Sequence, residues 1–374
     1  MSYPKVTIVE EGMREGMQIE SETIGVEAKI ELLDALSRTG LSRIVMGSFV
    51  SPKWTPQMAQ IDEVAKRFTR VPGVQYTALA LNEKGRERAA EHDLATRVGL
   101  PRSLVHVCDV FVRRNANRSQ QDEIDAIPAT VRRAVDAGAT EAMIAVNAAW
   151  GSNWLGEFSD EQRMELLQRQ HDAWTEAGIA VTGISFGDPM GWNVPHKVAG
   201  QLRAALERWP EIRTVHLHLH DARGTALTSA YAALEVLDDR HELILDTAIG
   251  GMGGCPYCGH GRMTRMIPTE DAVDMLHEMG IETGVDLDKL IEAAALAEEV
   301  VGHELWGHVS KAGPRPRGER LYAMDMPFIE TAEQAQHFRK GPQVYAGARS
   351  PWREPITSPA RDAVERSLQE GTTR

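Results

Sequence analysis

The stretch Thr214-Val215-His216-Leu217-His218-Leu219-His220-Asp221 alternates apolar side chains with imidazoles. This alternation predicts a β-strand, because successive side chains of a strand point to opposite faces of its sheet. His218 and His220 then lie on the same face. Two imidazoles on one face, joined by an acidic side chain from elsewhere in the chain, are typical of a nitrogen and oxygen site for a divalent metal. The alternative is a set of hydrogen-bonded or surface histidines.

Similar apolar runs recur on both sides of this segment, and amphipathic helical patterns separate them. The predicted strands are residues 6–11, 43–49, 74–81, 104–110, 141–148, 183–188, 214–221 and 243–250. The predicted helices are residues 26–38, 57–68, 124–137, 161–177, 198–209, 227–237 and 270–279. Such alternation indicates parallel strands with crossover helices. Eight strands in about 280 residues predict an α/β fold of the (β/α)8 TIM-barrel type rather than a doubly wound sheet.

The regular alternation ends near residue 300. We therefore expect a barrel domain in residues 1–295 and a C-terminal extension in residues 296–374. The extension contains a stretch rich in Pro, Gly and Arg at residues 311–317 and one short helical pattern at residues 328–338. It is expected to form a cap, to contact another subunit, or to be partly disordered.

Composition argues against several classes of function. With 42% hydrophobic and 25% charged residues, the 374-residue chain is typical of a soluble globular protein. Its formal net charge of -13 argues against a nucleic-acid-binding surface, which requires a basic stripe. No apolar run approaches the roughly 20 residues of a membrane span. Three cysteines are too few for a disulfide scaffold, and no signal-peptide core follows Met1, so a cytoplasmic location is expected.

Polar side chains follow several of the predicted strands, where a TIM barrel carries its site. They include Arg14, Glu15, Gln18, Ser48, Arg113, Asn147 and Asp188. Arg14 next to Glu15 offers a permanent cation and a hard oxygen ligand, although such a pair is often only a solvated ion pair. The alternative to a site role for Asp188 is a place in a turn or as a helix cap. Their common position at strand ends favours the metal site over the surface histidines.

The eighth predicted strand leads into a glycine-rich loop that contains Cys255, Cys258 and His260. Its glycines allow the loop to close over a site and to bring Cys255 to a reaction centre. Cys-Pro-Tyr-Cys also resembles a dithiol redox motif, but that motif belongs at a strand-to-helix turn early in a small domain. A structural zinc bound by these three residues lacks an evident fourth ligand.

Six motifs occur together in one order along the chain. They are residues 14–18 (Arg-Glu-Gly-Met-Gln), 48–58, 187–188 (Gly-Asp), 218–221 (His-Leu-His-Asp), 253–257 (Gly-Gly-Cys-Pro-Tyr) and 283–290. From about residue 6 to about residue 290, the chain resembles the 3-hydroxy-3-methylglutaryl-CoA lyase family of metal-dependent TIM barrels. The resemblance implies cleavage of a carbon–carbon bond beside a tertiary alcohol, which yields an enolate and a ketone or keto acid.

The resemblance also implies roles for individual residues. Glu15, His218 and His220 would bind a divalent metal, with Mg²⁺ or Mn²⁺ expected and Co²⁺ or Zn²⁺ as alternatives. Arg14 would stabilise the enolate oxygen, and Asp188 would lie near the substrate hydroxyl. Cys255 would protonate the enolate carbon or otherwise serve as an acid or base. The substrate-binding residues are expected to be Gln18, Ser48, Arg113, Asn147 and His260. A small-molecule substrate, as a free acid or a CoA thioester, and a homodimer are expected by analogy.

Four positions depart from the family pattern. Glu15 stands where the family has Asp, and the family's Asn ligand has no match, so His260 is the substitute to consider. Val45 and Ser21 replace a carboxylate and a lysine of the family. We therefore expect a lyase for a 3-hydroxy acid or 3-hydroxyacyl-CoA other than the family's usual substrate. The alternatives are an aldolase or Claisen-type synthase of the same barrel class, and a non-catalytic relative with a binding role.

Overall fold

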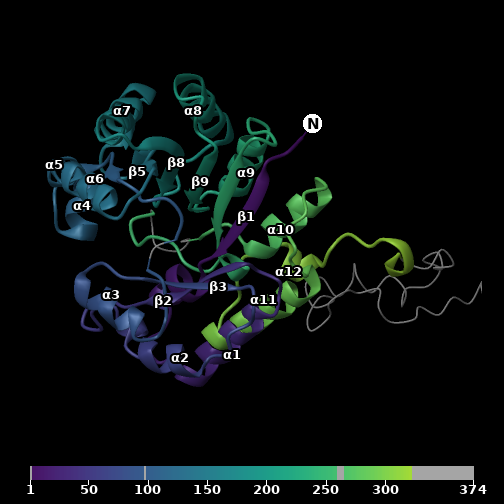
Figure 1. Cartoon of the computed structure of the whole chain (residues 1–374). Coiled ribbons are helices and arrows are strands. Elements are labelled where there is room, and N and C mark those ends of the chain that lie inside the picture. Colours follow the sequence, from purple (N-terminus) through teal and green to yellow (C-terminus); the bar gives the residue numbers. More distant parts are fainter. Residues whose placement is uncertain (1, 97, 259–264, 322–374) are drawn as a thin grey trace, which may run out of the picture. The chain divides into compact units, whose positions relative to one another are not determined.

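The computed structural model describes residues 2–96, 98–258 and 265–321, and it forms two compact units (Figure 1). The first unit is Met1–Gly307, and the second begins at His308. In the second unit the described helices are α12 (Val309–Ala312) and the 3-10 turn η5 (Gly318–Arg320). The short helix predicted at residues 328–338 lies outside the described residues. Within the described ranges, no helix is long and apolar enough to cross a membrane.

The first unit is built on eight strands whose paired neighbours all run parallel, in the order β3-β2-β1-β10-β9-β8-β5-β4. Their bounds are β1 Lys5–Glu10, β2 Arg43–Ser48, β3 Gln75–Leu79, β4 Val105–His106, β5 Glu141–Asn147, β8 Ala180–Asp188, β9 Thr214–Leu219 and β10 Glu242–Thr247. The fold is an α/β TIM barrel, as predicted. A short antiparallel hairpin, β6 (Gly151–Ser152) and β7 (Gly156–Glu157), follows β5.

Helices surround these strands in Figure 1. Their bounds are α1 Val26–Ser37, α2 Ile61–Arg67, α3 Glu83–Ala90, α4 Asp109–Ala116, α5 Gln120–Asp125, α6 Ile127–Asp136, α7 Asp160–Glu176, α8 Pro195–Arg208, α9 Ala226–Leu234, α10 Thr269–Glu278 and α11 Leu287–Val301. Each helix predicted within residues 1–295 has a counterpart. Helices α3, α4, α5 and α11 were not predicted.

The strand predicted at residues 104–110 is wrong at its carboxyl end. Only Val105–His106 is β-strand, and α4 begins at Asp109. The Cys108 sulfur accepts a hydrogen bond from the Phe111 amide and caps this helix. The Cys108 sulfur binds an amide that has no partner inside the helix and so stabilises the start of α4 at Asp109. The chain therefore enters the helix before the predicted strand is complete.

The register of the strands places several polar residues at one level. His218 lies opposite Gly187 of β8 and Asp246 of β10, and His106 lies opposite Asn147. Residues at the same level of a parallel sheet point to the same face. In β9 the imidazoles share this face, while Val215, Leu217 and Leu219 of the other face are fully buried. The sheet therefore collects polar side chains towards the carboxyl ends of four strands, β4, β5, β9 and β10.

Candidate metal centre

The side chains of Glu15, His218 and His220 meet at the carboxyl ends of β1 and β9. One ligand atom from each lies within 4.8 Å of the other two. The Nε2 atoms of His218 and His220 are 3.1 Å apart, and His220 Nε2 is 3.7 Å from Glu15 Oε1. Two imidazole nitrogens and one carboxylate oxygen are a donor set that suits a divalent cation. The three residues expected to bind metal are thus brought together, and the longer side chain of Glu15 still reaches the histidines.

A one-turn π-helix, η1 (Gly12–Gly16), holds Arg14 and Glu15 at this point. Arg14 Nη1 contacts Glu15 Oε2, and its Nε donates to Glu11 Oε2 at 2.8 Å. Burial raises the pKa of Glu15, but the charge of Arg14 opposes burial, and the pKa lies below its ordinary value. Glu15 is therefore a charged carboxylate, and Arg14 holds its second oxygen.

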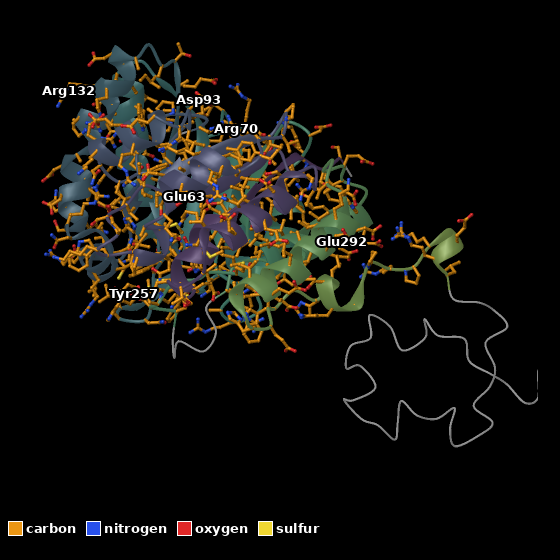
Figure 2. All side chains as sticks on the ribbon, turned by 90° about the horizontal axis from the view of Figure 1, so that it is seen from below. Glu63, Arg70, Asp93, Arg132, Tyr257 and Glu292 are labelled. Atoms are coloured by element: carbon orange, nitrogen blue, oxygen red, sulfur yellow. The ribbon has the colours of Figure 1, made fainter. Side chains whose placement is uncertain are left out.

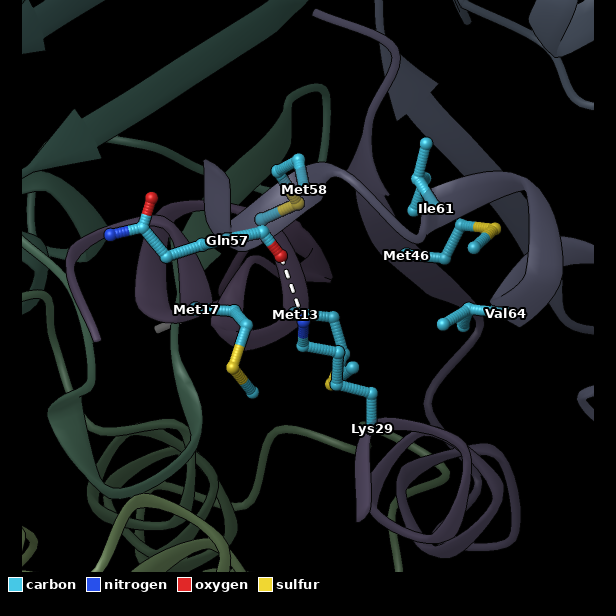
Figure 3. A pocket seen from close by; sticks show the side chains of 8 residues that line it. All are labelled: Met13, Met17, Lys29, Met46, Gln57, Met58, Ile61 and Val64. Atoms are coloured by element: carbon cyan, nitrogen blue, oxygen red, sulfur yellow. Dashed lines mark hydrogen bonds between the residues drawn. The ribbon is translucent and has the colours of Figure 1, made fainter. Parts of the chain in front are cut away.

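Apolar packing holds η1 and the residue that follows it. Figure 3 shows Met13 and Met17 in a cavity that is also lined by Lys29, Met46, Gln57, Met58, Ile61 and Val64. Lys29 Nζ donates to the Gln57 carbonyl at 2.8 Å, which satisfies the one charged group of this lining. The methionines thus fix the turn that presents Arg14 and Glu15.

The loop after β10 packs directly on this turn. Gly253 has φ +93°, and a Cβ there would lie 2.9 Å from the carbonyl carbon of Glu15. A Cβ at Gly16 would lie 2.7 Å from Met252 Cβ. Glycine at both positions lets the Cys255 loop approach the backbone of Glu15 and Gly16 closely.

Asp246 orients two of the histidines. Its Oδ2 lies 2.8 Å from His218 Nδ1, and its Oδ1 lies 2.9 Å from His216 Nε2. Burial raises the pKa of Asp246, but the two imidazoles lower it far more, and its pKa is well below the ordinary value. Burial lowers the pKa of His218, yet Asp246 outweighs burial and raises it. No role for Asp246 or His216 was predicted, since cross-strand register is not visible in a single segment.

Asp188 keeps one oxygen available. Its Oδ2 accepts hydrogen bonds from the backbone and side-chain nitrogens of Asn193 at 2.6 and 2.7 Å, while Oδ1 has no hydrogen-bond partner among the described residues. Burial raises its pKa. The His220 amide donates to the Asp188 carbonyl at 3.2 Å, so the two residues are tied together. Asp188 is therefore part of a turn, and its buried Oδ1 is an acceptor without a partner among the described residues, beside His220.

Cys255 and Cys258 form a buried thiol pair next to the centre. Cys258 Sγ lies 2.9 Å from the Pro189 carbonyl and 3.8 Å from His220 Nδ1. The hydrogen bond between the two cysteines, together with burial, raises the pKa of Cys255 far above its ordinary value. The same bond lowers the pKa of Cys258. Cys255 thus keeps its proton at neutral pH.

The residues expected to bind substrate fall in different environments. Gln18 lies in the 3-10 turn η2 (Met17–Ile19) and is half-buried. Ser48, at the end of β2, is buried, and its Oγ has no partner among the described residues. Arg113 is exposed and donates to Asp109 at 2.6 Å. His260 lies outside the described residues.

Asn147, the remaining expected substrate residue, ends β5 and contacts a pair that was not predicted. Its Nδ2 lies 3.2 Å from His106 Nε2, and His106 Nδ1 lies 2.9 Å from Glu123 Oε2. Both His106 and Glu123 are buried. The sequence showed only a histidine within the strand predicted at residues 104–110, because Glu123 comes from α5.

Comparisons with known proteins agree with this geometry. A family model described as HMGL-like matches residues 5–297. The hydroxymethylglutaryl-CoA lyase of Bacillus subtilis is 36% identical over 308 residues, which cover 82% of this chain and 96% of that protein. The mitochondrial hydroxymethylglutaryl-CoA lyase of Mus musculus is 33% identical over 83% of this chain and 90% of that protein.

Two solved structures are also similar. The HMG-CoA lyase structure from Bacillus subtilis has a TM-score of 0.68 at 35% identity and covers 83% of this chain and 98% of its own. An HMG-CoA lyase from Acinetobacter baumannii, solved with coenzyme A and 3-methylmalate, has a TM-score of 0.68 at 30% identity and covers 85% and 98%.

Proposed function

Because the chain belongs to the HMGL-like family, we propose that it is a divalent-metal-dependent carbon–carbon lyase that cleaves a 3-hydroxy acid or its CoA thioester. The observation that carries this proposal is the grouping of Glu15, His218 and His220 beside a buried thiol pair. The chemistry that a bound Mg²⁺ or Mn²⁺ supplies there is polarisation of the substrate oxygens.

The reaction needs a base for the 3-hydroxyl group. Oδ1 of Asp188 has no other partner among the described residues, and burial raises its pKa, which makes the ionised carboxylate a stronger proton acceptor. As the hydroxyl loses its proton, the bond between C2 and C3 breaks. C3 becomes the carbonyl carbon of a ketone or keto acid, and the bonding electrons remain on C2 as an enolate.

The enolate needs a cation and then a proton. Arg14 is a permanent cation at this face, and its contacts with Glu11 and Glu15 fix its direction. Such a preorganised charge stabilises the developing oxyanion. Cys255 keeps its proton because of its hydrogen bond to Cys258 and its burial, so it is suited to protonate C2. Proton transfer from a positioned side chain typically contributes about 10²–10⁴-fold in rate.

The substrate is proposed to differ from that of the family's hydroxymethylglutaryl-CoA lyases. Support comes from the positions where this chain departs from the resemblance. Val45 replaces a carboxylate, and the loop after Cys255 lacks the family's Asn ligand. A CoA thioester remains the leading substrate form, since a relative at 30% identity was solved with coenzyme A and an acid.

The test joins metal analysis to a substrate screen. Protein stripped with EDTA is reloaded with Mg²⁺, Mn²⁺, Co²⁺ or Zn²⁺ and offered 3-hydroxyacyl-CoAs and free 3-hydroxy acids, including hydroxymethylglutaryl-CoA. We expect one metal ion per chain and release of an acyl product plus a ketone or keto acid. His220→Ala should lose both, whereas His196→Ala, at an exposed position on α8, should lose neither.

Three results would contradict the proposal. Cleavage that survives complete metal removal would exclude a metal-dependent lyase. Release of free CoA from acetyl-CoA only in the presence of a keto acid would favour a synthase. Failure to bind any divalent metal, with His220→Ala behaving like the wild type, would favour a non-catalytic relative.

A further inference from the structure

Lys29 is a buried charged side chain that the proposed reaction does not use. It lies on α1 and lines the cavity of Figure 3, where its Nζ donates to the Gln57 carbonyl at 2.8 Å. Lys29 is 5% exposed, and burial lowers the pKa of its ammonium group. Burying an ammonium group costs free energy, and an apolar side chain of the same length would fill the cavity without that cost. Stability alone therefore does not account for a lysine at this position.

Gln57 connects Lys29 to the turn that carries Glu15. It lies in the 3-10 turn η3 (Pro56–Met58), and its Nε2 donates to the Glu20 carbonyl at 3.0 Å. Glu20 directly follows η2, and η2 directly follows η1. The side chain of Glu20 has a separate contact, because its Oε2 lies 2.8 Å from His303 Nε2. Lys29 thus holds the Gln57 backbone, and the Gln57 side chain holds the end of the turn formed by η1 and η2.

This turn depends on contacts from outside itself. Its first part is a single π-helical turn, in which the Gly16 amide donates to the Glu11 carbonyl at 3.2 Å. Such π-helical turns are rare and are frequent at functional sites. Met13 and Met17 pack against the cavity lining, but methionine side chains are flexible and adapt to their neighbours. The direction of the turn therefore has to be set by hydrogen bonds to other elements.

Two hydrogen bonds supply this direction, one at each end of the turn. At its start, Glu10 Oε1 accepts from the Gly12 amide at 2.7 Å, and at its end the Gln57 side chain binds the backbone. Glu15 lies between these two points, with its Oε1 3.7 Å from His220 Nε2. Ligand distances in metal sites vary by only about 0.2 Å. A small shift of the turn would therefore weaken metal binding.

We propose that Lys29 and Gln57 are positioning residues for the metal centre, which hold the turn of η1 and η2 so that Glu15 meets His218 and His220. The inference rests on the metal centre of the proposed function and adds to it a support that acts through the backbone. The alternative is that Lys29 only fills the cavity. The two differ in a testable way, because methionine would preserve the packing but would not hold Gln57.

Three substitutions separate positioning from packing. Lys29→Met fills a similar volume but removes the donor to the Gln57 carbonyl. Gln57→Met keeps that carbonyl but removes the donor to Glu20. Lys29→Gln keeps a neutral donor and should retain part of the contact. The matched controls are Lys66→Met and Gln60→Met, which make the same changes at exposed positions on α2 and directly before it.

The first measurement is hydrogen–deuterium exchange of the full chain in EDTA, followed in peptides by mass spectrometry. Loss of one hydrogen bond should make residues 12–20 exchange about 2- to 10-fold faster in Lys29→Met and Gln57→Met. Residues 214–219 of β9 should exchange at the wild-type rate, and both control variants should match the wild type throughout. The unfolding temperature of Lys29→Met should stay close to that of the wild type, because the cost of the buried ammonium group is removed.

The second measurement is Mn²⁺ binding to the same proteins by calorimetry. Loss of a group that directly supports a metal ligand typically weakens binding by about 10- to 100-fold. Lys29 and Gln57 act through the backbone of the turn, so we expect about 3- to 10-fold weaker binding in Lys29→Met and Gln57→Met. The electron paramagnetic resonance spectrum of the bound Mn²⁺ should change as well, since it reports the geometry of the ligands.

Three outcomes would overturn the inference. The first is unchanged exchange of residues 12–20 in both variants. The second is faster exchange of residues 12–20 and 214–219 together with a lower unfolding temperature, which would indicate a structural role only. The third is faster exchange of the turn with unchanged Mn²⁺ affinity. A wild type that binds no Mn²⁺ would contradict the proposed function, and exchange in EDTA would still decide whether Lys29 and Gln57 position the turn.

Discussion

Oδ2 of Asp246 accepts a hydrogen bond from His218 Nδ1 at 2.8 Å, across the neighbouring strands β10 and β9. This bond keeps the His218 proton on Nδ1 and leaves Nε2, which faces His220, free as a ligand. Asp246→Asn would place an amide donor against Nδ1 and favour the tautomer with its proton on Nε2. We expect about 10- to 100-fold weaker Mn²⁺ binding, measured by calorimetry.

The matched control for this change is His216→Gln. It alters the other partner of Asp246 but leaves the contact with His218 in place. Its Mn²⁺ affinity should stay within a few-fold of the wild type. Unchanged affinity in Asp246→Asn would show that the carboxylate does not set the orientation of His218.

The two cysteines of the thiol pair should respond differently to substitution. Cys258 Sγ accepts the Cys255 proton, and this bond raises the pKa of Cys255. In Cys258→Ala, which removes the acceptor, the pKa of Cys255 should therefore fall towards its ordinary value, and Cys255 should alkylate faster at pH 8 than in the wild type. The measurement is the rate of iodoacetamide modification against pH. An alkylation profile identical to that of the wild type would contradict the assigned bond.

The same pair gives a prediction for turnover. Cys255→Ser should lower kcat by about 10²–10⁴-fold, because the proton donor is lost, while the bound metal is retained. Cys258→Ser should have a smaller effect. Equal losses in both variants, accompanied by loss of Mn²⁺, would indicate that the cysteines support the metal centre rather than donate a proton.

Much of this site follows from local sequence pattern. The period of two along β9 puts His218 and His220 on one face, and the first strand of the barrel brings Glu15 to the same end of the sheet. The α/β alternation predicted all eight strands. The predicted bounds of β4 extended too far towards the carboxyl end, because Cys108 caps α4 two residues after the strand ends.

Contacts between side chains of different elements could not be predicted in the same way. Asp246 meets His218 only through the register of β9 with β10, and this register depends on the whole barrel. Glu123 reaches His106 from α5, a short helix whose place against β4 is set by tertiary packing. Contacts of this kind leave no periodic trace in the sequence. Local sequence pattern thus indicated Glu15, His218 and His220. The packing of strands and helices, which a local pattern does not show, determines how such polar side chains are oriented.

A hairpin contact should hold the Cys255 loop in place. Asn153 Nδ2 donates to the Tyr257 carbonyl at 2.5 Å, and the rings of Trp154 and Tyr257 are 5.0 Å apart. Figure 2 labels Tyr257 at the edge of the molecule. Asn153→Ala should free the loop, speed alkylation of the cysteines several-fold and lower kcat. Leu155→Ala, on the same hairpin at an exposed position, is the control and should change neither. Unchanged alkylation in Asn153→Ala would rule out this anchoring role.

Glu270 should make the stability of the fold depend on pH. It lies fully buried in the first turn of α10, and its Oε2 accepts from the Gly250 amide at 3.0 Å. Burial raises its pKa from 4.5 to about 8. Between these values the folded protein holds a proton that the unfolded chain has released, so the free energy of unfolding falls as pH rises. The contribution of the protonated Glu270 to the free energy of unfolding is fully present below pH 4.5 and is lost by about pH 8.

Glu270→Gln keeps the shape of the side chain and removes its titration. Each shifted group contributes a slope of about 1.4 kcal/mol per pH unit within its window. Urea unfolding at pH 5.5, 7 and 8.5 in EDTA should therefore show a flatter decline for Glu270→Gln than for the wild type. Burial also raises the pKa of Glu10, to about 7, so a residual slope below that pH should remain in the variant. Glu278→Gln, at an exposed position of the same helix, should keep the wild-type slope. Equal slopes in all three proteins would mean that Glu270 is not protonated in the folded state.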